Sequence, residues 1–298
     1  MKTLPICLLC LLNHPALAAD TWTDVEPGIR HLHRTSAGPL EMDALLIDLC
    51  DPSLSLRATR SDERAQITST WAQQVGARAA INGDFFNYTG YVPIGLAVGD
   101  GERWSDTADG NWALFAAGAD AQADIRLAAE TLAAPEFWMR QVVGGMPNCL
   151  IDGQPQYDTA SHYDELHPRT AVGLSADGRQ LVLLVIDGRS TASIGATTET
   201  VGEVLADLGA WQGLNLDGGG SSTLWLADQG VVNTPSGGSQ RVVANHLAII
   251  RQSVPAGEPS RCCVPEPSAG ATGTFEDVPD DHWAYEAIEA LVAAGITH

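Results

Sequence analysis

Residues 180–217, QLVLLVIDGRSTASIGATTETVGEVLADLGAWQGLNLD, decide the fold class that the sequence predicts. Gln180–Ile186 is a nearly continuous apolar run, which is typical of a strand buried on both faces. A helical pattern of apolar residues follows behind a capping box formed by Thr200 and Glu203. Trp211–Leu216 then has the pattern of a second strand. Because such crossovers usually join parallel strands, we expect an α/β or α+β fold: a mixed sheet with a βαβ unit and additional β hairpins.

Two carboxylates follow these strands directly. Asp187 comes after the first strand and Asp217 after the second, so both are expected at the C-terminal edge of the sheet, where open α/β sheets bind their ligands. Gly218, Gly219 and Gly220 come next, and their N–H groups could form an anion-binding nest. Ser221 and Ser222 add hydroxyl donors. A plain flexible turn is the alternative interpretation of this segment.

Three further segments carry candidate site residues. Asn82 and Asp84 lie in a turn after a predicted strand, which is either a substrate-facing turn or an ordinary Asn-Gly hairpin. The HPRT segment at 167–170 offers His167 as an acid and Arg169 as a phosphate clamp, because a guanidinium forms paired hydrogen bonds to phosphate oxygens; the alternative is an exposed loop. In the third segment, Arg241 and Asn245 precede a core strand, and a surface position is as plausible for them as a role in the site.

Composition and charge exclude several classes of function. The formal net charge of -21 argues against a nucleic-acid partner. Lys2 is the only lysine, and it lies in the predicted signal peptide. The mature chain therefore has no Walker-type phosphate loop, no Schiff-base lysine and no lysine general base. Any phosphate must be bound by arginine, backbone N–H groups or a metal.

The chain divides into four predicted parts. Residues 1–18 have the features of a signal peptide, so we expect a secreted, periplasmic or cell-surface protein that is not transmembrane. A main domain at 20–252 is followed by a Pro/Gly/Ser-rich linker at 253–273. Residues 274–298 form a short helical segment. Cys50, Cys149, Cys262 and Cys263 remain after cleavage, and export predicts at least one disulfide between positions distant in sequence.

Six segments together resemble the phosphodiester glycosidase family, and they span most of residues 43–250. They are INGDFFN (81–87), VVGGMPNCLIDG (142–153), HPRTAVGL (167–174), VIDGR (185–189), NLDGGGSSTLW (215–225) and RVVANHL (241–247). A second resemblance, carried by FEDVP at 275–279 and HWA at 282–284, is to the first part of an S-layer homology module. That resemblance implies a cell-wall polymer as a partner of the C-terminal segment.

The first resemblance implies an exported hydrolase that releases a sugar, N-acetylglucosamine-like, from a sugar-1-phosphodiester of a glycan or glycoconjugate. Arg169, Arg241 and the N–H groups of the three glycines are then expected to stabilise charge. Asp187 or Asp217 would be the base or nucleophile. No cofactor is required, but a divalent metal held by Asp84, Asp187 and Asp217 stays open. The rival hypotheses are a metal-assisted phosphodiesterase that cleaves the P–O bond and a non-catalytic glycan-binding protein.

Overall fold

The computed structural model describes residues 19–36, 38–106, 112–119, 121–130, 134–157, 161–255 and 260–262. The predicted signal peptide and the predicted partial S-layer homology module lie outside these residues, as does most of the predicted linker. In the part of the chain that is described, no helix is long and apolar enough to cross a membrane.

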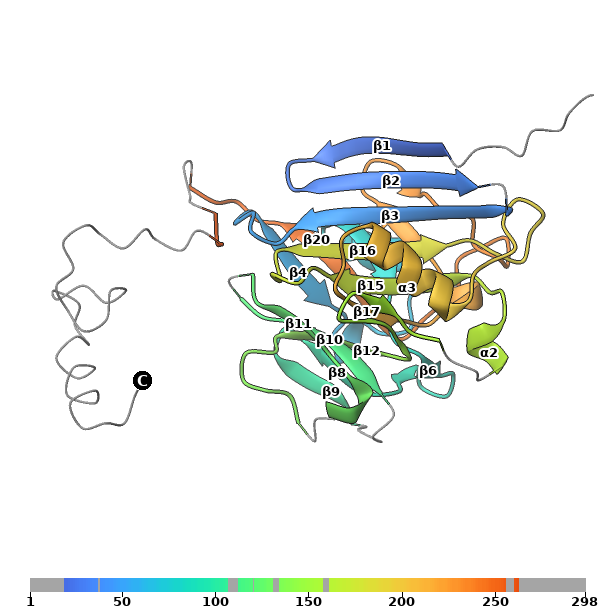
Figure 1. Ribbon diagram of the computed structural model, residues 1–298. Helices are drawn as coiled ribbons and strands as arrows, with labels where there is room; N and C mark the ends of the chain where they lie inside the picture. The colour runs from blue at the N-terminus through green and yellow to red at the C-terminus, as the bar shows by residue number, and fades with distance from the viewer. Residues whose placement is uncertain are drawn as a thin grey trace, which may run out of the picture. The chain divides into compact units, whose positions relative to one another are not determined.

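The largest sheet has eight strands, and every pairing in it is antiparallel (Figure 1). In sheet order, the strands are β1 (Ala19–Glu26), β2 (Ile29–Ser36), β3 (Leu40–Asp48), β16 (Gln180–Ile186), β15 (Arg169–Leu174), β17 (Gln212–Asn215), β13 (Asn148–Ile151) and β14 (Gln154–Pro155).

Two five-stranded sheets and one hairpin complete the β-structure. The second sheet has the order β11 (Ala123–Arg126), β10 (Ala113–Ala117), β12 (Gln141–Gly145), β8 (Leu96–Gly99) and β9 (Glu102–Asp106). The third has the order β19 (Gly230–Val231), β18 (Leu224–Leu226), β5 (Ala77–Asn82), β20 (His246–Arg251) and β4 (Leu54–Ala58). The hairpin pairs β6 (Phe86–Asn87) with β7 (Val92–Pro93).

In the described part of the chain, the helices are few and short. They are α1 (Thr68–Gln74), α2 (Ser161–Asp164), α3 (Thr198–Asp207) and the 3-10 turns η1 (Ser61–Glu63), η2 (Ala128–Glu130) and η3 (Gly219–Ser221). Helix α1 contains the buried Trp71 and stops before Gly76, which has a φ of +69°.

The predicted α/β or α+β class with a βαβ unit is wrong: the protein is β-rich and its sheets are antiparallel. β16 and β17 are not neighbours, because β15 lies between them and pairs antiparallel with both. The apolar run of β16 is nevertheless buried on both faces. One face of β16 packs in the core and the other packs under α3. An antiparallel strand that is covered on both faces therefore has the same continuous apolar sequence as a buried parallel strand.

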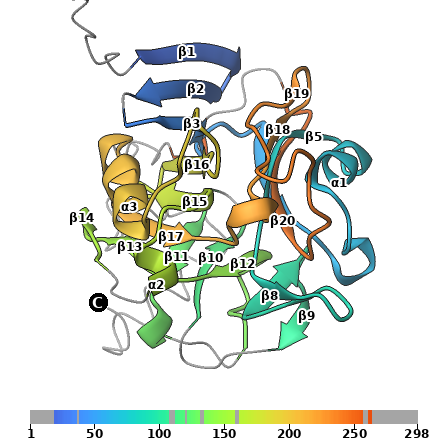
Figure 2. The same ribbon diagram turned by 90° about the vertical axis from the view of Figure 1, so that its right-hand side faces the viewer.

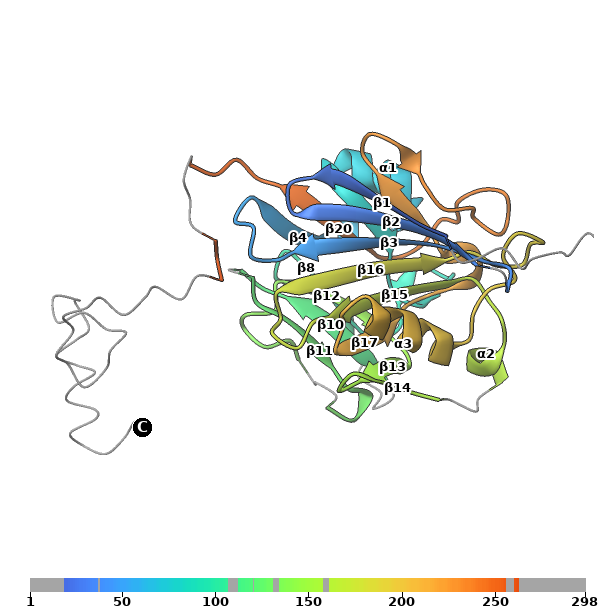
Figure 3. The same ribbon diagram turned by 45° about the horizontal axis from the view of Figure 1, so that its top comes forward.

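The start of α3 also differs from the prediction. Thr197 is the N-cap, and its side chain accepts a hydrogen bond from the Thr200 N–H at 3.1 Å. The helix therefore begins one turn before the predicted capping box. It lies across the outer face of the large sheet (Figures 1 and 3), where Val201 and Leu205 are fully buried against strand residues such as Leu184.

One hydrophobic core lies between the inner faces of the three sheets. Each sheet contributes fully buried side chains to it, for example Leu183 from β16, Phe115 from β10 and Ile81 from β5. Burying each such side chain stabilises the fold by about 1.5–3 kcal/mol. Strands from distant parts of the chain are thereby held in fixed positions, and the loops at their ends share that rigidity.

A disulfide joins Cys50 to Cys262, which confirms the prediction of a bridge between positions distant in sequence. Next to it, the Arg261 N–H donates to the Cys50 carbonyl at 2.9 Å. Cys149 is a free, buried thiol. The bridge fastens the end of the described chain to the turn that follows β3.

Candidate active site

A pocket of about 180 Å³ lies where β17 ends. The elements α2, β15 and β17, whose ends border it, can be followed in Figure 2. Five segments form its wall: the turn after β5, the stretch from α2 to the start of β15, the loop after β16, the glycine segment after β17 and the loop before β20. The lining residues are Phe85, His162, Tyr163, His167, Pro168, Arg169, Arg189, Asp217, Gly218, Gly219, Gly220 and Arg241.

Asp217 is fixed in this pocket through its main chain. Its N–H donates to the Gly83 carbonyl at 3.1 Å, and its carbonyl accepts from Asn82 Nδ2 at 2.6 Å. Asn82 is fully buried, and its Oδ1 accepts from the Thr170 hydroxyl at 2.9 Å and from the Thr223 N–H at 3.1 Å. Asn82 thus holds three segments around Asp217 and does not itself line the pocket.

The Asp217 carboxylate is partly buried and surrounded by donors. Burial raises its pKa to about 6. Hydrogen bonds from Ser221 and from the Gly218 N–H oppose this effect, as does the positive charge of Arg241, and all three lower the pKa of Asp217. A carboxylate in this setting is ionised at neutral pH and can accept a proton or attack an electrophile.

Two guanidinium groups lie on the glycine segment. Arg241 Nη1 donates to the Ser221 hydroxyl at 3.2 Å, and its guanidinium covers Gly220 so closely that any β-carbon there would collide with it. A β-carbon on Gly219 would stand 3.2 Å from Arg189 Nη2. The glycines therefore make room for arginine side chains. Arginine supplies the paired donors that phosphate oxygens require.

The backbone N–H groups of the glycine segment are mostly engaged within the protein. The Gly219 N–H donates to the Pro168 carbonyl at 2.8 Å, and the Gly218 N–H donates to the Asp217 carboxylate. The segment forms the short 3-10 turn η3. An anion in the pocket could therefore bind to the two arginines. An anion nest is not available, because most of the N–H groups that it would need already donate to protein atoms.

Arg169 lines the pocket, but its Nε and Nη2 groups point at the protein main chain. Nε donates to the Ala196 carbonyl at 2.9 Å, and Nη2 donates to the carbonyls of His162 and Glu165, both at 2.9 Å, and to that of Tyr163 at 3.2 Å. The side chain is buried, and burial lowers its pKa. Its contacts hold the pocket wall that α2 forms.

His167 lies at the rim of the pocket between two charged neighbours. Its Nε2 is 3.1 Å from Glu165 Oε2, and its Nδ1 is 3.5 Å from Arg189 Nη2. The carboxylate and the imidazole thereby help to orient the Arg189 side chain, which is otherwise exposed.

Asp84 and Asn245 lie behind Asp217 and outside the pocket. Both are buried; the Gly144 N–H donates to Asp84 Oδ1 at 2.5 Å, and Asn245 Nδ2 donates to Asp84 Oδ2. Asn245 Oδ1 in turn accepts from the His246 N–H at 2.8 Å. Burial, and to a smaller extent the charge of Asp217, raises the pKa of Asp84 to about 8.

Asp187 is separated from the pocket by its own contacts. Its carboxylate accepts from the Thr234 N–H at 2.8 Å and from Asn233 Nδ2 at 3.0 Å, so it anchors the loop after β19. Ser222 is likewise buried and does not line the pocket. Among the described residues, no three His, Cys, Asp or Glu side chains converge as metal ligands, and the three-carboxylate metal site is therefore not assembled.

The sequence interpretation missed Arg189 and the aromatic wall of the pocket. Arg189 follows β16 by three residues in the VIDGR segment. A signal was present, because an arginine directly after a buried strand and an Asp-Gly turn has no role in the core. Phe85, whose ring lies 5.6 Å from that of Trp112, gave no comparable signal.

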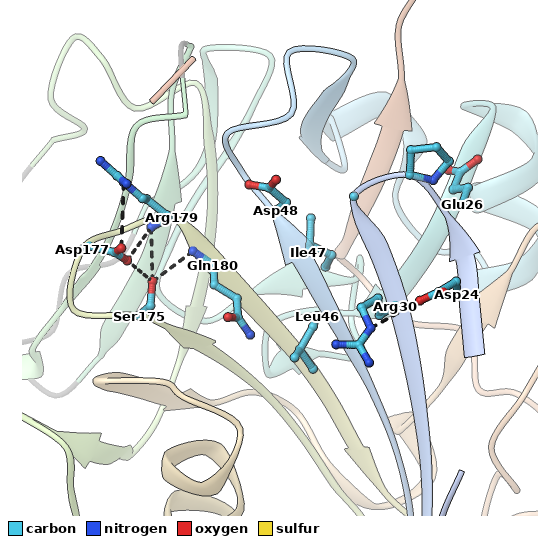
Figure 4. A pocket seen from close by; sticks show the side chains of 12 residues that line it. Asp24, Glu26, Arg30, Leu46, Ile47, Asp48, Ser175, Asp177, Arg179 and Gln180 are labelled. Carbon is cyan, nitrogen blue, oxygen red and sulfur yellow. Dashed lines mark hydrogen bonds and ion pairs between the residues drawn. The ribbon is translucent and has the colours of Figure 1, made fainter. Parts of the chain in front are cut away.

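A larger, open depression of about 860 Å³ lies at the opposite end of the large sheet (Figure 4). Four of its charged side chains form two pairs: Arg30 Nε lies 3.3 Å from Asp24 Oδ1, and Arg179 Nε lies 3.8 Å from Asp177 Oδ2. These groups are more than half exposed. Exposed, mutually paired charges lack the preorganisation that Asp217 and its two arginines share.

Comparisons with known proteins agree with this geometry. The family described as phosphodiester glycosidase matches residues 75–250. The SPbeta prophage-derived uncharacterized protein YomE of Bacillus subtilis is 35% identical over 94 residues, which are 32% of this chain and only 14% of that protein.

Three solved structures share the fold. A protein from Synechocystis superposes with a TM-score of 0.64 at 16% identity, covering 78% of this chain and 64% of its own. The catalytic domain of zebrafish N-acetylglucosamine-1-phosphodiester alpha-N-acetylglucosaminidase gives a TM-score of 0.61 at 20% identity, covering 81% and 85%. An exported protein from Burkholderia pseudomallei gives 0.51 at 16% identity, covering 71% and 74%.

The family match includes β5, the HPRTAVGL segment, the glycine segment and Arg241, and therefore most of the pocket. It extends over more than half of the chain. This chain belongs to the phosphodiester glycosidase family.

Proposed function

We propose that the protein is an exported hydrolase that releases an N-acetylglucosamine-like sugar from a sugar-1-phosphodiester. One observation carries the proposal: the Asp217 carboxylate shares a pocket with two guanidinium groups, Arg189 and Arg241, seated on glycines that leave space for them. A phosphodiester is an anion that two arginines can bind, and the sugar carbon attached to it is an electrophile that a carboxylate or an activated water can attack.

In the proposed reaction, Arg189 and Arg241 bind the phosphate oxygens while Asp217 faces C1 of the sugar. The C1–O bond breaks, and its electron pair leaves with the phosphate monoester. A water oxygen becomes bonded to C1, either directly with Asp217 as base or after Asp217 has formed a glycosyl ester. The leaving phosphate is a weak base, so charge stabilisation by arginine contributes more than protonation by a general acid.

The choice of sugar and the export rest on separate support. The zebrafish neighbour is named for N-acetylglucosamine-1-phosphodiester, and its fold is shared although its sequence is only 20% identical. The Cys50–Cys262 disulfide supports export, because disulfides persist in oxidising compartments. The name of the zebrafish protein and the disulfide together favour one substrate class, a glycan or glycoconjugate phosphodiester outside the cytoplasm.

Hydrolysis in oxygen-18 water tests the proposal. Purified protein is incubated with a panel of sugar-1-phosphodiesters, and both products are analysed by mass spectrometry. We expect the label in the released sugar, and no release by the Asp217→Asn variant. Label in the phosphate would mean P–O cleavage, which is the rival phosphodiesterase reaction. Binding of the panel without turnover would instead favour the non-catalytic glycan-binding alternative.

A further inference from the structure

A cluster of three aromatic rings, one exposed and two partly exposed, lies on the β6–β7 hairpin. The ring of Phe86 is 5.0 Å from that of Tyr88 and 5.6 Å from that of Tyr91, and the two tyrosine rings are 6.4 Å apart. Tyr88 is 63% exposed. Phe86 and Tyr91 are partly buried beside it. Large aromatic side chains normally bury most of their surface, so an exposed tyrosine ring supported by two partly exposed rings indicates a surface that binds something.

The backbone of the hairpin is held in an unusual conformation that keeps the cluster together. Tyr91 has a φ of +51°, which is a rare and costly value for a residue with a bulky side chain. The tip is anchored by Arg64, whose Nε donates to the Gly90 carbonyl at 3.0 Å. At the base, the Ile94 N–H donates to the Phe85 carbonyl at 2.7 Å. The aromatic surface is thus formed before any ligand arrives.

The cluster begins one residue from the wall of the active-site pocket. Phe85 lines that pocket and is followed directly by Phe86. The pocket itself holds about 180 Å³, less than the roughly 300–1,000 Å³ of pockets that enclose a drug-sized ligand. A phosphodiester with a ring on each side of the phosphate therefore extends beyond the pocket, and the hairpin that follows Phe85 in the sequence carries an aromatic surface.

The chemistry of the cluster suits a sugar ring. Aromatic faces pack against the apolar C–H face of a pyranose, while phenol hydroxyls can bond to its hydroxyl groups. Within the described chain, the hydroxyl groups of Tyr88 and Tyr91 make no hydrogen bond to protein atoms. The formal net charge of -21 disfavours an anionic lipid surface as the occupant.

We propose that Phe86, Tyr88 and Tyr91 form a subsite for the sugar on the far side of the phosphate, the aglycone, within the proposed reaction. This inference rests on the proposed function for the position of the phosphate. It assigns the hairpin to recognition of the leaving half of the substrate, and it predicts that the hairpin affects binding of a sugar aglycone without affecting the chemical step.

Three substrates that share one glycosyl group separate these effects: the phosphodiester carries a second sugar, a methyl group or an n-octyl chain. The test variants are Tyr88→Ala and Tyr88→Phe. Phe137→Ala is the matched control, because it also removes an exposed aromatic ring but does not line the pocket. For the sugar aglycone we expect Tyr88→Ala to raise KM about five- to tenfold at unchanged kcat. Tyr88→Phe should restore most of the affinity, and the methyl ester should respond to none of the variants.

The outcomes are decisive in both directions. An effect of Tyr88→Ala no larger than that of Phe137→Ala overturns the subsite, and an effect on the octyl ester instead of the sugar ester overturns the assignment to a sugar. If the wild-type protein cleaves none of the three esters, the proposed function fails and saturation-transfer NMR with N,N′-diacetylchitobiose tests the hairpin by itself. A saturation-transfer signal that the wild-type protein gives and Tyr88→Ala abolishes supports the subsite, and absence of the signal with the wild-type protein overturns it.

Discussion

Gly220 lies directly beneath the guanidinium of Arg241, and a β-carbon at this position would overlap Nη2. The glycine therefore determines where the arginine can lie, and the arginine in turn approaches the hydroxyl of Ser221 and lowers the pKa of Asp217. A residue with no side chain thus controls the electrostatics of the pocket.

We expect Gly220→Ala to displace Arg241 and to lower kcat/KM by about 10²-fold or more, because a preorganised charge is lost from the site. The matched control is Gly38→Ala, since a β-carbon at Gly38 meets no atom within 4 Å. Steady-state kinetics and the melting temperature of both variants check the prediction. Equal activity of the two would show that the position of Arg241 is unimportant.

Arg189 and Arg169 should respond to substitution in different ways. Arg189→Ala removes an exposed group that we propose binds the phosphate, so kcat/KM should fall by about 10²- to 10³-fold while the melting temperature stays unchanged. Arg169→Lys cannot reproduce the contacts of the guanidinium with several main-chain carbonyls. It should therefore lower the melting temperature, and activity should fall along with it.

Arg179→Ala serves as the control for these arginines, because its side chain pairs only loosely with Asp177 at the opposite end of the sheet. Kinetics and differential scanning calorimetry of the three variants decide the assignment. A stable Arg169→Lys variant that had lost its affinity for substrate would reassign the phosphate contact to Arg169.

Asp217 should set the acidic limb of the pH–rate profile. Its pKa is raised to about 6, and the charged form is the one that acts as base or nucleophile, so kcat/KM should increase as the pH rises through about 6. Asp217→Asn should fold normally and lose at least about 10³-fold in kcat, a barrier increase near 4 kcal/mol.

Asp187→Asn is the matching comparison for Asp217→Asn. Since Asp187 holds Asn233 and Thr234 and does not line the pocket, this substitution should lower the melting temperature and leave turnover within about tenfold of the wild-type value. The reverse pattern in the two variants would place the active site at Asp187.

The protein should become less stable as the pH rises toward 8, because the buried Asp84 side chain loses its proton over that range. Its pKa is raised from 3.8 in the reference state to about 8 in the folded protein, so the folded state binds the proton more tightly and the stabilisation is lost as the pH increases through about 8. His246, whose pKa is lowered from 6.5 to about 3, acts in the opposite sense but only below its reference value. The free energy of unfolding should therefore decrease between about pH 6.5 and 8.

Urea denaturation across that range measures the effect. Asp84→Asn should flatten the decrease, and Asp228→Asn, at an exposed site, should leave it unchanged. If the pH dependence of the Asp84→Asn variant equals that of the wild-type protein, the buried carboxylate is not its source.

Local features of the domain could be predicted from the sequence. The strand at Gln180–Ile186 and the position of Asp217 at the end of a buried strand both follow from patterns within about ten residues. The distant disulfide followed from the predicted export and from the number of cysteines. The family also followed, because the motif around the three glycines together with HPRTAVGL is distinctive.

The sheet order and the contacts of individual polar groups could be decided only by the tertiary structure. The apolar pattern of β16 records burial on both faces but not which neighbour pairs with it, and β15 takes the place between β16 and β17. Asp187 and Asp217 follow strands that run in the same direction, yet one binds Thr234 and the other faces the pocket. A local pattern specifies where a side chain can be buried, whereas its hydrogen-bond partners come from segments far away in the sequence, which only the folded chain brings together.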